Sequence, residues 1–282
     1  MRGGLASLSG IAALAGLFGL ASTAAPAAAP RAAVADPFPG VAAAYEVRID
    51  GRTQWSAHAD QPLPPASLTK VMTALLVLEA GRADAAVVVS ARAAEATGAG
   101  LGLRAGERMR ASALLAATLI RSANDACLAL AEWVAGSEAA FVARMNERAA
   151  LLGLAGTRFA NACGHDAKDH RSTAHDLARL AEAALALPEF ARIVATESAV
   201  VRTEGGRTWR LASTNALLGR VPGVRGVKSG YTKRAGTCVI VAAEREGRRV
   251  LVVLLGATDR WWDAAAIVER AFDAARVASR RA

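Results

Sequence analysis

Segments that favour β-structure lie at both ends of this 282-residue chain, and the segments between them favour helices. Near the start, residues 41–49 and 53–57 flank Asp50-Gly51, a dipeptide typical of a hairpin turn. Because strands from both ends can join one sheet, we predict an α+β fold of three layers (α/β/α). Its antiparallel sheet would have about five strands and carry an inserted, mostly helical region. The C-terminal strands are expected over residues 227–232, 237–244 and 249–256.

The chain between these strands carries helical patterns and helix-start signals. Ser137 can cap one helix, and Thr173-Ala174-His175-Asp176 forms a capping box for another. Residues 250–255 are an unbroken apolar run, which predicts a strand covered on both faces. The expected helices cover residues 67–80, 109–120, 126–134, 137–153, 173–187 and 263–278.

The N-terminal residues are not expected to belong to the fold. Residues 5–21 are an apolar run behind a weakly cationic start, and small residues follow. This pattern indicates a secretory signal peptide over residues 1–24, with an uncleaved segment that contacts the membrane as the alternative. Residues 25–37 form an Ala/Pro-rich lead-in, and residues 38–282 are expected to form the domain of an exported protein.

The net charge and the cysteines give less information about function than the strand and helix patterns give about fold. The net charge is +9, but the arginines are scattered without interleaved aromatic residues, so we do not predict nucleic-acid binding. Three cysteines, Cys127, Cys163 and Cys238, allow at most one disulfide bond within the chain. Cys127 falls in an apolar predicted helix and Cys238 in an apolar predicted strand. We therefore expect both to be small buried hydrophobic residues.

Lysine is rare in this chain, which has four lysines and thirty arginines. Lys70 closes a Ser-x-x-Lys run that begins at Ser67. Residues three apart lie on one face of a helix, so the Lys70 Nζ can reach the Ser67 hydroxyl. A desolvated lysine can lose its proton and then activate a serine nucleophile, whereas arginine cannot. By itself, however, such a run is more often a helix start with an exposed lysine.

Ser122-x-Asn124 lies between two apolar predicted helices. Ser122 could pass a proton from Lys70 to a leaving amine, and the Asn124 amide could bond both a substrate carbonyl and Lys70. A second Ser-x-Asn run lies at residues 213–215, only fifteen residues before Lys228. We choose the first run because it follows Ser67 by a helical excursion long enough to fold back over the active-site helix.

Lys228-Ser229-Gly230 opens a predicted strand. The Lys228 cation and the Ser229 hydroxyl could hold a C-terminal carboxylate. Gly230 has no side chain, so a substrate backbone could lie alongside the strand. The N–H of Tyr231 could join that of Ser67 in an oxyanion hole. The alternative is an ordinary turn, which explains less at the head of an apolar strand.

The three motifs in this order resemble those of the low-molecular-mass penicillin-binding proteins, the serine D-alanyl-D-alanine carboxypeptidases. The likeness covers roughly residues 40–275 and goes beyond the motifs. Segments similar to those of the family are residues 65–73, 122–126, 157–161, 172–177 and 227–232, with Ala235-Gly236.

The resemblance implies a β-lactamase/transpeptidase-like fold and a serine D,D-peptidase domain over residues 38–282. It implies removal of the terminal D-alanine from peptidoglycan stem pentapeptides through an acyl-enzyme on Ser67, with Lys70 and Ser122 also catalytic. It further implies β-lactams as covalent inhibitors, no cofactor or metal, and a periplasmic, extracellular or cell-wall-associated location. The substrate-binding residues would be Asn124, Lys228, Ser229, Gly230, Tyr231 and Thr232.

Two positions depart from the family pattern. Ser229 stands where threonine is usual, and Gly164-His165 stands where Gly-Leu is usual. The C-terminal β-rich domain and amphipathic membrane tail of the best-known members are also expected to be absent.

Other enzymes of the same superfamily remain as alternatives. A D,D-endopeptidase that cuts peptidoglycan cross-links would use the same residues. A serine β-lactamase would need a glutamate for deacylation in a Glu-x-x-Leu-Asn-like loop after the second motif. The glutamates in that stretch lack this context: Glu182, Glu189, Glu197 and Glu204.

Three hypotheses from other classes are weaker. A metal hydrolase would use His165, Asp166, His170 and His175, but their spacing suits no common zinc motif. We expect these histidines to be surface or capping residues. A Ser-His-Asp hydrolase lacks a Gly-x-Ser-x-Gly elbow, and a catalytically dead binder of wall peptides is disfavoured because the three motifs are intact.

Overall fold

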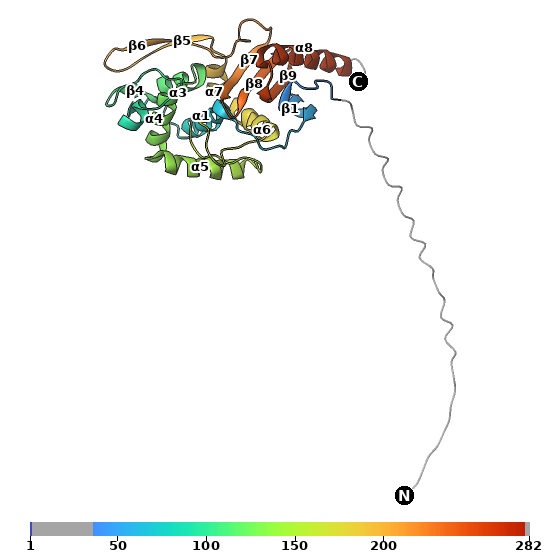
Figure 1. Ribbon diagram of the computed structural model, residues 1–282, viewed down its shortest axis with the longest axis horizontal. Helices are drawn as coiled ribbons and strands as arrows, with labels where there is room; N and C mark the ends of the chain where they lie inside the picture. Colours follow the sequence, from blue (N-terminus) through green and yellow to red (C-terminus); the bar gives the residue numbers. More distant parts are fainter. Residues whose placement is uncertain (2–35, 280–282) are drawn as a thin grey trace. The chain divides into compact units, whose positions relative to one another are not determined.

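Five strands form one antiparallel sheet in the order β2-β1-β9-β8-β7 (Figure 1). The computed structural model describes Met1 and residues 36–279. The expected signal peptide and nearly all of the lead-in lie outside these residues, so the proposed boundaries at 24 and 37 stay predictions. The strands are β1 (Ala42–Ile49), β2 (Arg52–Ala57), β7 (Val224–Thr232), β8 (Gly236–Arg245) and β9 (Arg248–Ala257).

The predicted α+β architecture, with a sheet built from both ends of the chain, is confirmed. β1 pairs directly with β9, from Ala42 opposite Ala257 to Ile49 opposite Val250. Helix α8 (Arg260–Ser279) packs on one face of the sheet, and α6 (Ala174–Leu185) packs on the other (Figure 1). The sheet is therefore the middle layer of three.

The apolar run of β9 is buried on both faces, as predicted. Val250, Val252 and Leu254 belong to the hydrophobic core beneath α8. Leu251, Val253 and Leu255 belong to the second core, which they share with the helical region. Because side chains alternate along a strand, one continuous apolar sequence serves both cores.

The helical region is built around α1 (Lys70–Glu79), which is preceded directly by a 3-10 turn, η1 (Ala66–Thr69). Seven of the ten α1 residues are buried, and the helix contacts α3, α4, α5, α6 and α7. The Ser137 and Thr173 side chains cap α5 and α6, as predicted. The remaining elements are β3 (Ala86–Val88), α2 (Ala91–Ala94), β4 (Arg108–Arg110), α3 (Ala111–Ile120), α4 (Asn124–Ala135), α5 (Glu138–Leu151), α7 (Pro188–Val194), β5 (Ser198–Arg202) and β6 (Thr208–Ala212).

Some element boundaries differ from the prediction. Met109 is not helical but lies in β4, opposite Val87 of β3, so α3 begins two residues later than expected. Pro188 starts a separate helix, α7, because proline suits the first helical turn but interrupts a helix interior. The hairpin β5–β6 was not predicted, because its strands are short and mostly exposed.

Cys127 is buried, as expected, but it does not serve only as a small hydrophobic residue. Cys127 on α4 is joined to Cys163 by a disulfide, with 6.0 Å between their Cα atoms. Cys238 is free and buried, as expected. Among the described residues, no single helix has the length and apolar character of a membrane span; α4 and α5 meet such a criterion only as a pair bent by 82°.

Candidate active site

Ser67 lies in the η1 turn, where the chain approaches strand β7. The Ser67 side chain is partly exposed, whereas its neighbours Ala66 and Leu68 are buried. A Cβ atom on Gly230 would lie only 2.8 Å from the Ser67 nitrogen. The close approach of η1 therefore requires a glycine at this position. The motif alone suggested a different reason, namely room for a substrate backbone.

Lys70 is the first residue of α1 and is completely buried. Its Nζ lies 3.0 Å from the Ser67 Oγ, 2.8 Å from the Asn124 Oδ1 and 2.5 Å from the carbonyl oxygen of Cys163. Burial, and then the charge of Lys228, lower the pKa of Lys70 well below that of a free lysine. A neutral amine at this position can accept the proton of the Ser67 hydroxyl.

Ser122 and Asn124 lie at the junction of α3 and α4. Ser122 adopts a positive φ of 63°, which sets the sharp turn between the helices. The Asn124 Oδ1 accepts a hydrogen bond from Lys70, as expected, and its Nδ2 donates to the carbonyl of Thr97 at 2.6 Å. Asn124 therefore links the lysine of α1 to the loop that follows α2.

Lys228 on β7 is also buried and connects the third motif to the second. Its Nζ donates to the Ser122 Oγ at 2.9 Å and to the Ser229 carbonyl at 2.7 Å. Burial, and then the charge of Arg260, lower the pKa of Lys228 to about 7. The hydrogen-bond partner of Ser122 is thus Lys228, rather than the Lys70 expected from the motifs.

The remaining residues of the third motif point to different neighbours. The Ser229 Oγ donates to the Thr214 Oγ1 at 3.1 Å, so the second Ser-x-Asn run, which was set aside as a motif, lies beside the site. The Tyr231 side chain is largely exposed. The Thr232 Oγ1 donates to Asp166 at 2.6 Å and so contacts the loop of Cys163.

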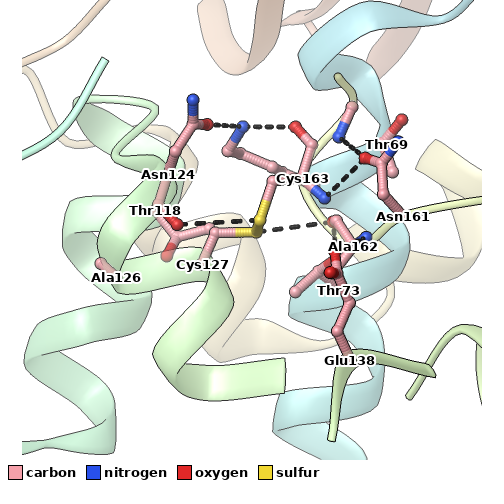
Figure 2. Close-up of a disulfide and its surroundings, with 12 residues drawn as sticks. Thr69, Thr73, Thr118, Asn124, Ala126, Cys127, Glu138, Asn161, Ala162 and Cys163 are labelled. Carbon is pink, nitrogen blue, oxygen red and sulfur yellow. Dashed lines mark hydrogen bonds between the residues drawn. A yellow bond between two sulfur atoms is a disulfide. The ribbon is translucent and has the colours of Figure 1, made fainter. Parts of the chain in front are cut away.

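This loop, residues 161–166, could not be recognised from the motifs. The Asn161 Oδ1 accepts hydrogen bonds from the backbone N–H groups of Cys163, Gly164 and His165. Gly164 has a φ of 90°, and a Cβ there would lie 2.0 Å from the Ala66 carbonyl oxygen. The loop therefore packs directly against the turn of the proposed nucleophile. Figure 2 shows Asn161, Ala162 and Cys163 facing the helix of Asn124 and Cys127.

The sequence also gave no signal for two further groups at the site. The carbonyl of Cys163 is a backbone atom, and its role does not depend on the type of side chain. Arg260, at the start of α8, donates to the Gly230 carbonyl at 2.9 Å and lies close enough to influence Lys228. A single arginine among thirty carries no recognisable pattern.

The expectation of surface or capping histidines is wrong for His170, which is buried. Its Nδ1 accepts from the Ala160 N–H, and its Nε2 lies 2.8 Å from the Thr69 Oγ1. Burial lowers the pKa of His170 to about 4, so the ring is neutral and supports the turn that carries Ser67. His175 instead bonds Glu46 on β1. Between residues 36 and 279, no three His, Cys, Asp or Glu side chains converge to hold a metal ion.

The fold and the three converging motifs define a serine enzyme of the penicillin-binding class. Residues 33–259 match the model of the peptidase S11 family, D-alanyl-D-alanine carboxypeptidase, and the chain belongs to this family. It is 36% identical over 216 residues to the D-alanyl-D-alanine carboxypeptidase DacF of Bacillus subtilis, covering 75% of this chain and 56% of DacF. It is also 36% identical to DacB2 of Mycobacterium tuberculosis, covering 77% of this chain and 75% of DacB2.

A solved structure supports the same fold. Penicillin-binding protein D2 from Listeria monocytogenes, in its ampicillin-bound form, superimposes with a TM-score of 0.73 at 33% identity. The match covers 82% of this chain and 97% of the Listeria protein. The predicted transpeptidase-like fold is therefore confirmed. The chain spans little more than half of the length of DacF.

Proposed function

We propose that this protein is a serine D-alanyl-D-alanine carboxypeptidase that removes the terminal D-alanine from peptidoglycan stem pentapeptides. One observation carries the proposal: a fully buried lysine Nζ lies 3.0 Å from the hydroxyl of a partly exposed serine. The two residues belong to motifs shared in order with the family to which the chain belongs.

The acylation step follows from this geometry. Lys70 takes the proton of the Ser67 hydroxyl while the Oγ attacks the carbonyl between two D-alanines. The amide C–N bond breaks, and the leaving D-alanine receives a proton through Ser122, which is held by Lys228. Water then attacks the ester on Ser67 and releases the shortened peptide, returning the serine to its hydroxyl form.

The third motif is proposed to hold the substrate. Lys228 and the Ser229 hydroxyl lie where a C-terminal carboxylate can be bound next to Ser122. Gly230 places the edge of β7 beside Ser67, so the N–H groups of Tyr231 and Ser67 are the proposed donors to the developing oxyanion. Asn124 and Thr232 complete the set of substrate-binding residues.

The proposed location agrees with the proposed substrate. The apolar N-terminal run is typical of a secretory signal, and peptidoglycan peptides are processed outside the cytoplasmic membrane. We therefore propose that the enzyme is exported to the periplasm or the cell wall. β-Lactams are the proposed covalent inhibitors, since the ring carbonyl takes the place of the scissile carbonyl and a relative is known in its ampicillin-bound form.

Product analysis with two substrates tests the function. The purified protein is incubated with monomeric pentapeptide muropeptides and, separately, with cross-linked dimers. Release of D-alanine from the pentapeptide is expected. Dimers split to monomers, with pentapeptides left intact, would replace the proposal with the D,D-endopeptidase alternative.

Intact-protein mass spectrometry tests the nucleophile. It should show one penicillin adduct that is lost in Ser67→Ala. An adduct that persists in this variant would contradict the assignment of Ser67.

A further inference from the structure

The disulfide of this protein lies next to the proposed catalytic base. Cys127 follows Asn124 by three residues, so both lie on the same face of α4. Cys163 belongs to the loop of residues 161–166, thirty-six positions later in the chain. Figure 2 shows the sulfur–sulfur bond that joins Cys127 of this helix to Cys163 of the loop.

Two of the three groups that hold Lys70 belong to the segments joined by this bond. The Cys163 carbonyl accepts from the Lys70 Nζ at 2.5 Å, and the Asn124 Oδ1 accepts at 2.8 Å. The third partner is the Ser67 hydroxyl at 3.0 Å. The bond between the cysteines therefore fixes the spacing between two acceptors on opposite sides of the amine.

The loop has other anchors, which limit the consequences of losing the bond. The Ala162 carbonyl accepts from the Thr73 Oγ1 at 2.5 Å, and the Ala162 N–H donates to Glu138 at 3.0 Å. Asn161 also caps three N–H groups within the loop. We therefore expect the protein to fold without the disulfide, with the main change at residues 163–164.

We propose that the Cys127–Cys163 disulfide is a positioning element for Lys70, so that full acylation activity requires the oxidised pair. This inference rests on the proposed role of Lys70 as the base. The bond forms when the Cys127 and Cys163 thiols together give up two electrons and two protons. An oxidised thiol oxidoreductase accepts them, and its own disulfide is reduced to two thiols. A dithiol reverses the step through a mixed disulfide. Both cysteines are buried, so the bond resists reduction once the protein has folded.

A positioning role predicts an effect on the chemistry itself. Displacing the Cys163 carbonyl removes an acceptor that favours the protonated amine and disturbs its alignment with Ser67. The titratable groups that face Lys70 are Lys228 on β7 and His165 on the same loop, and Glu138 and Asp166 lie next to His165. We expect these groups to keep their places when the bond is removed, because the His165 N–H still donates to the Asn161 Oδ1. The acid limb of the acylation profile should therefore move to lower pH through Lys70 alone.

The test measures acylation by a fluorescent penicillin, which needs no peptide substrate. The second-order rate constant is followed across the pH range for the full chain and for Cys127→Ala, Cys163→Ala and the double variant. Cys238→Ala serves as the matched control, since it removes a buried sulfur that forms no disulfide. Thermal unfolding of each protein is recorded in parallel.

We expect the rate constant to fall by ~10- to 100-fold in all three variants, because a small displacement of a catalytic group has effects of this size. The double variant should match the singles, since either substitution removes the same bond. Because the bond resists reduction in the folded protein, wild type is unfolded, reduced with dithiothreitol and refolded; it should show the same loss, and reoxidation with oxidised glutathione should restore the rate.

Some outcomes would overturn the inference. If the double variant unfolds at a lower temperature but keeps its rate constant within about twofold of wild type and its pH profile unchanged, the disulfide only stabilises the fold. If wild-type protein is acylated but releases no D-alanine, the proposed function fails while the result for the disulfide stands. If the oxidised wild type is not acylated at all, both proposals fall.

Discussion

The Nζ of Lys228 lies 2.9 Å from the Oγ of Ser122, although the two residues are 106 positions apart in the chain. This contact joins the edge strand of the sheet to the turn between α3 and α4. Both residues are buried, so no solvent competes strongly for the hydrogen bond. The protonation state of Lys228 therefore determines what Ser122 can donate or accept.

Lys228 should make the stability of the protein depend on pH. Burial and Arg260 lower its pKa to about 7, whereas a lysine in an unfolded chain has a pKa of about 10.4. Between these values the unfolded chain binds more protons, so the free energy of unfolding rises with pH. The added stability, on the order of a few kcal/mol, is lost as pH falls through the folded pKa. Lys70 acts in the same direction.

Urea unfolding at a series of pH values measures this effect. We expect the wild-type free energy of unfolding to increase from about pH 7 to about pH 10. In Lys228→Met the increase should be smaller, because of the two buried lysines only Lys70 then remains to release its proton on folding. Equal slopes in the two proteins would show that Lys228 keeps its proton in the folded state.

Lys70→Arg should fold but lose acylation. The guanidinium keeps the positive charge of a protonated lysine but does not release a proton, so it cannot serve as a base. A loss of about 10²- to 10⁴-fold in the acylation rate constant is expected. Lys168→Arg is the matched control, because Lys168 is exposed and lies outside the site. Circular dichroism checks the fold, and wild-type acylation rates in Lys70→Arg would refute the role of the base.

Gly230→Ala should displace the nucleophile without removing any functional group. The new Cβ would lie 2.8 Å from the Ser67 nitrogen and 3.0 Å from the Ala66 Cβ. Overpacking of this kind lowers the free energy of unfolding by about 1–3 kcal/mol. The resulting shift of η1 should lower the acylation rate constant more than roughly tenfold, because a small misplacement of a reacting group has an effect of this size.

Gly205→Ala provides the comparison for Gly230→Ala, since Gly205 lies in the exposed β5–β6 hairpin with only the Thr203 side chain nearby at 3.8 Å. Thermal unfolding and penicillin labelling of both variants give the result. If Gly230→Ala behaves like this control, the close approach of β7 to η1 is not important for the nucleophile.

Reducing the disulfide should lower thermodynamic stability apart from its effect on rate. The bond closes a loop across thirty-six positions, for which chain entropy predicts about 4 kcal/mol of stabilisation. Guanidinium unfolding of oxidised and fully reduced wild-type protein, with Cys238→Ala as a control, gives the difference. A difference near zero would mean that the reduced chain is already restricted in this region.

The sequence was most informative where chemistry depends on side-chain type. Ser67, Lys70 and Asn124 were assigned to one site from their spacing, and the structure brings their polar atoms together. The sheet from both chain ends was also predictable, because the longer β-strand patterns lie on either side of a mostly helical stretch. A backbone carbonyl is present at every residue, so no residue type marks its role. The hydrogen bond from Lys70 to the Cys163 carbonyl was therefore not predicted.

The missed disulfide has a similar cause. Cys127 lies in an apolar helix, where an unpaired buried cysteine fits the pattern as well as a bonded one. Only the loop geometry brings Cys163 close, and that geometry depends on Asn161 bonds and on Gly164 packing against η1. Likewise, Thr214 belongs to the Ser-x-Asn run that was set aside, and its contact with Ser229 arises from tertiary packing rather than from a motif.

The pairing of β1 with β9 means that the site cannot be complete until the last strand has been synthesised. A growing chain contains Ser67, Lys70 and Ser122 long before β7, β8 and β9 have been made. Until then β1 has only β2 as a partner, and an isolated hairpin is barely stable in water. Without the finished core, burial would not lower the pKa of Lys70. We therefore expect an incomplete chain to hold the proposed nucleophile and base in an inactive arrangement until the last strand closes the sheet.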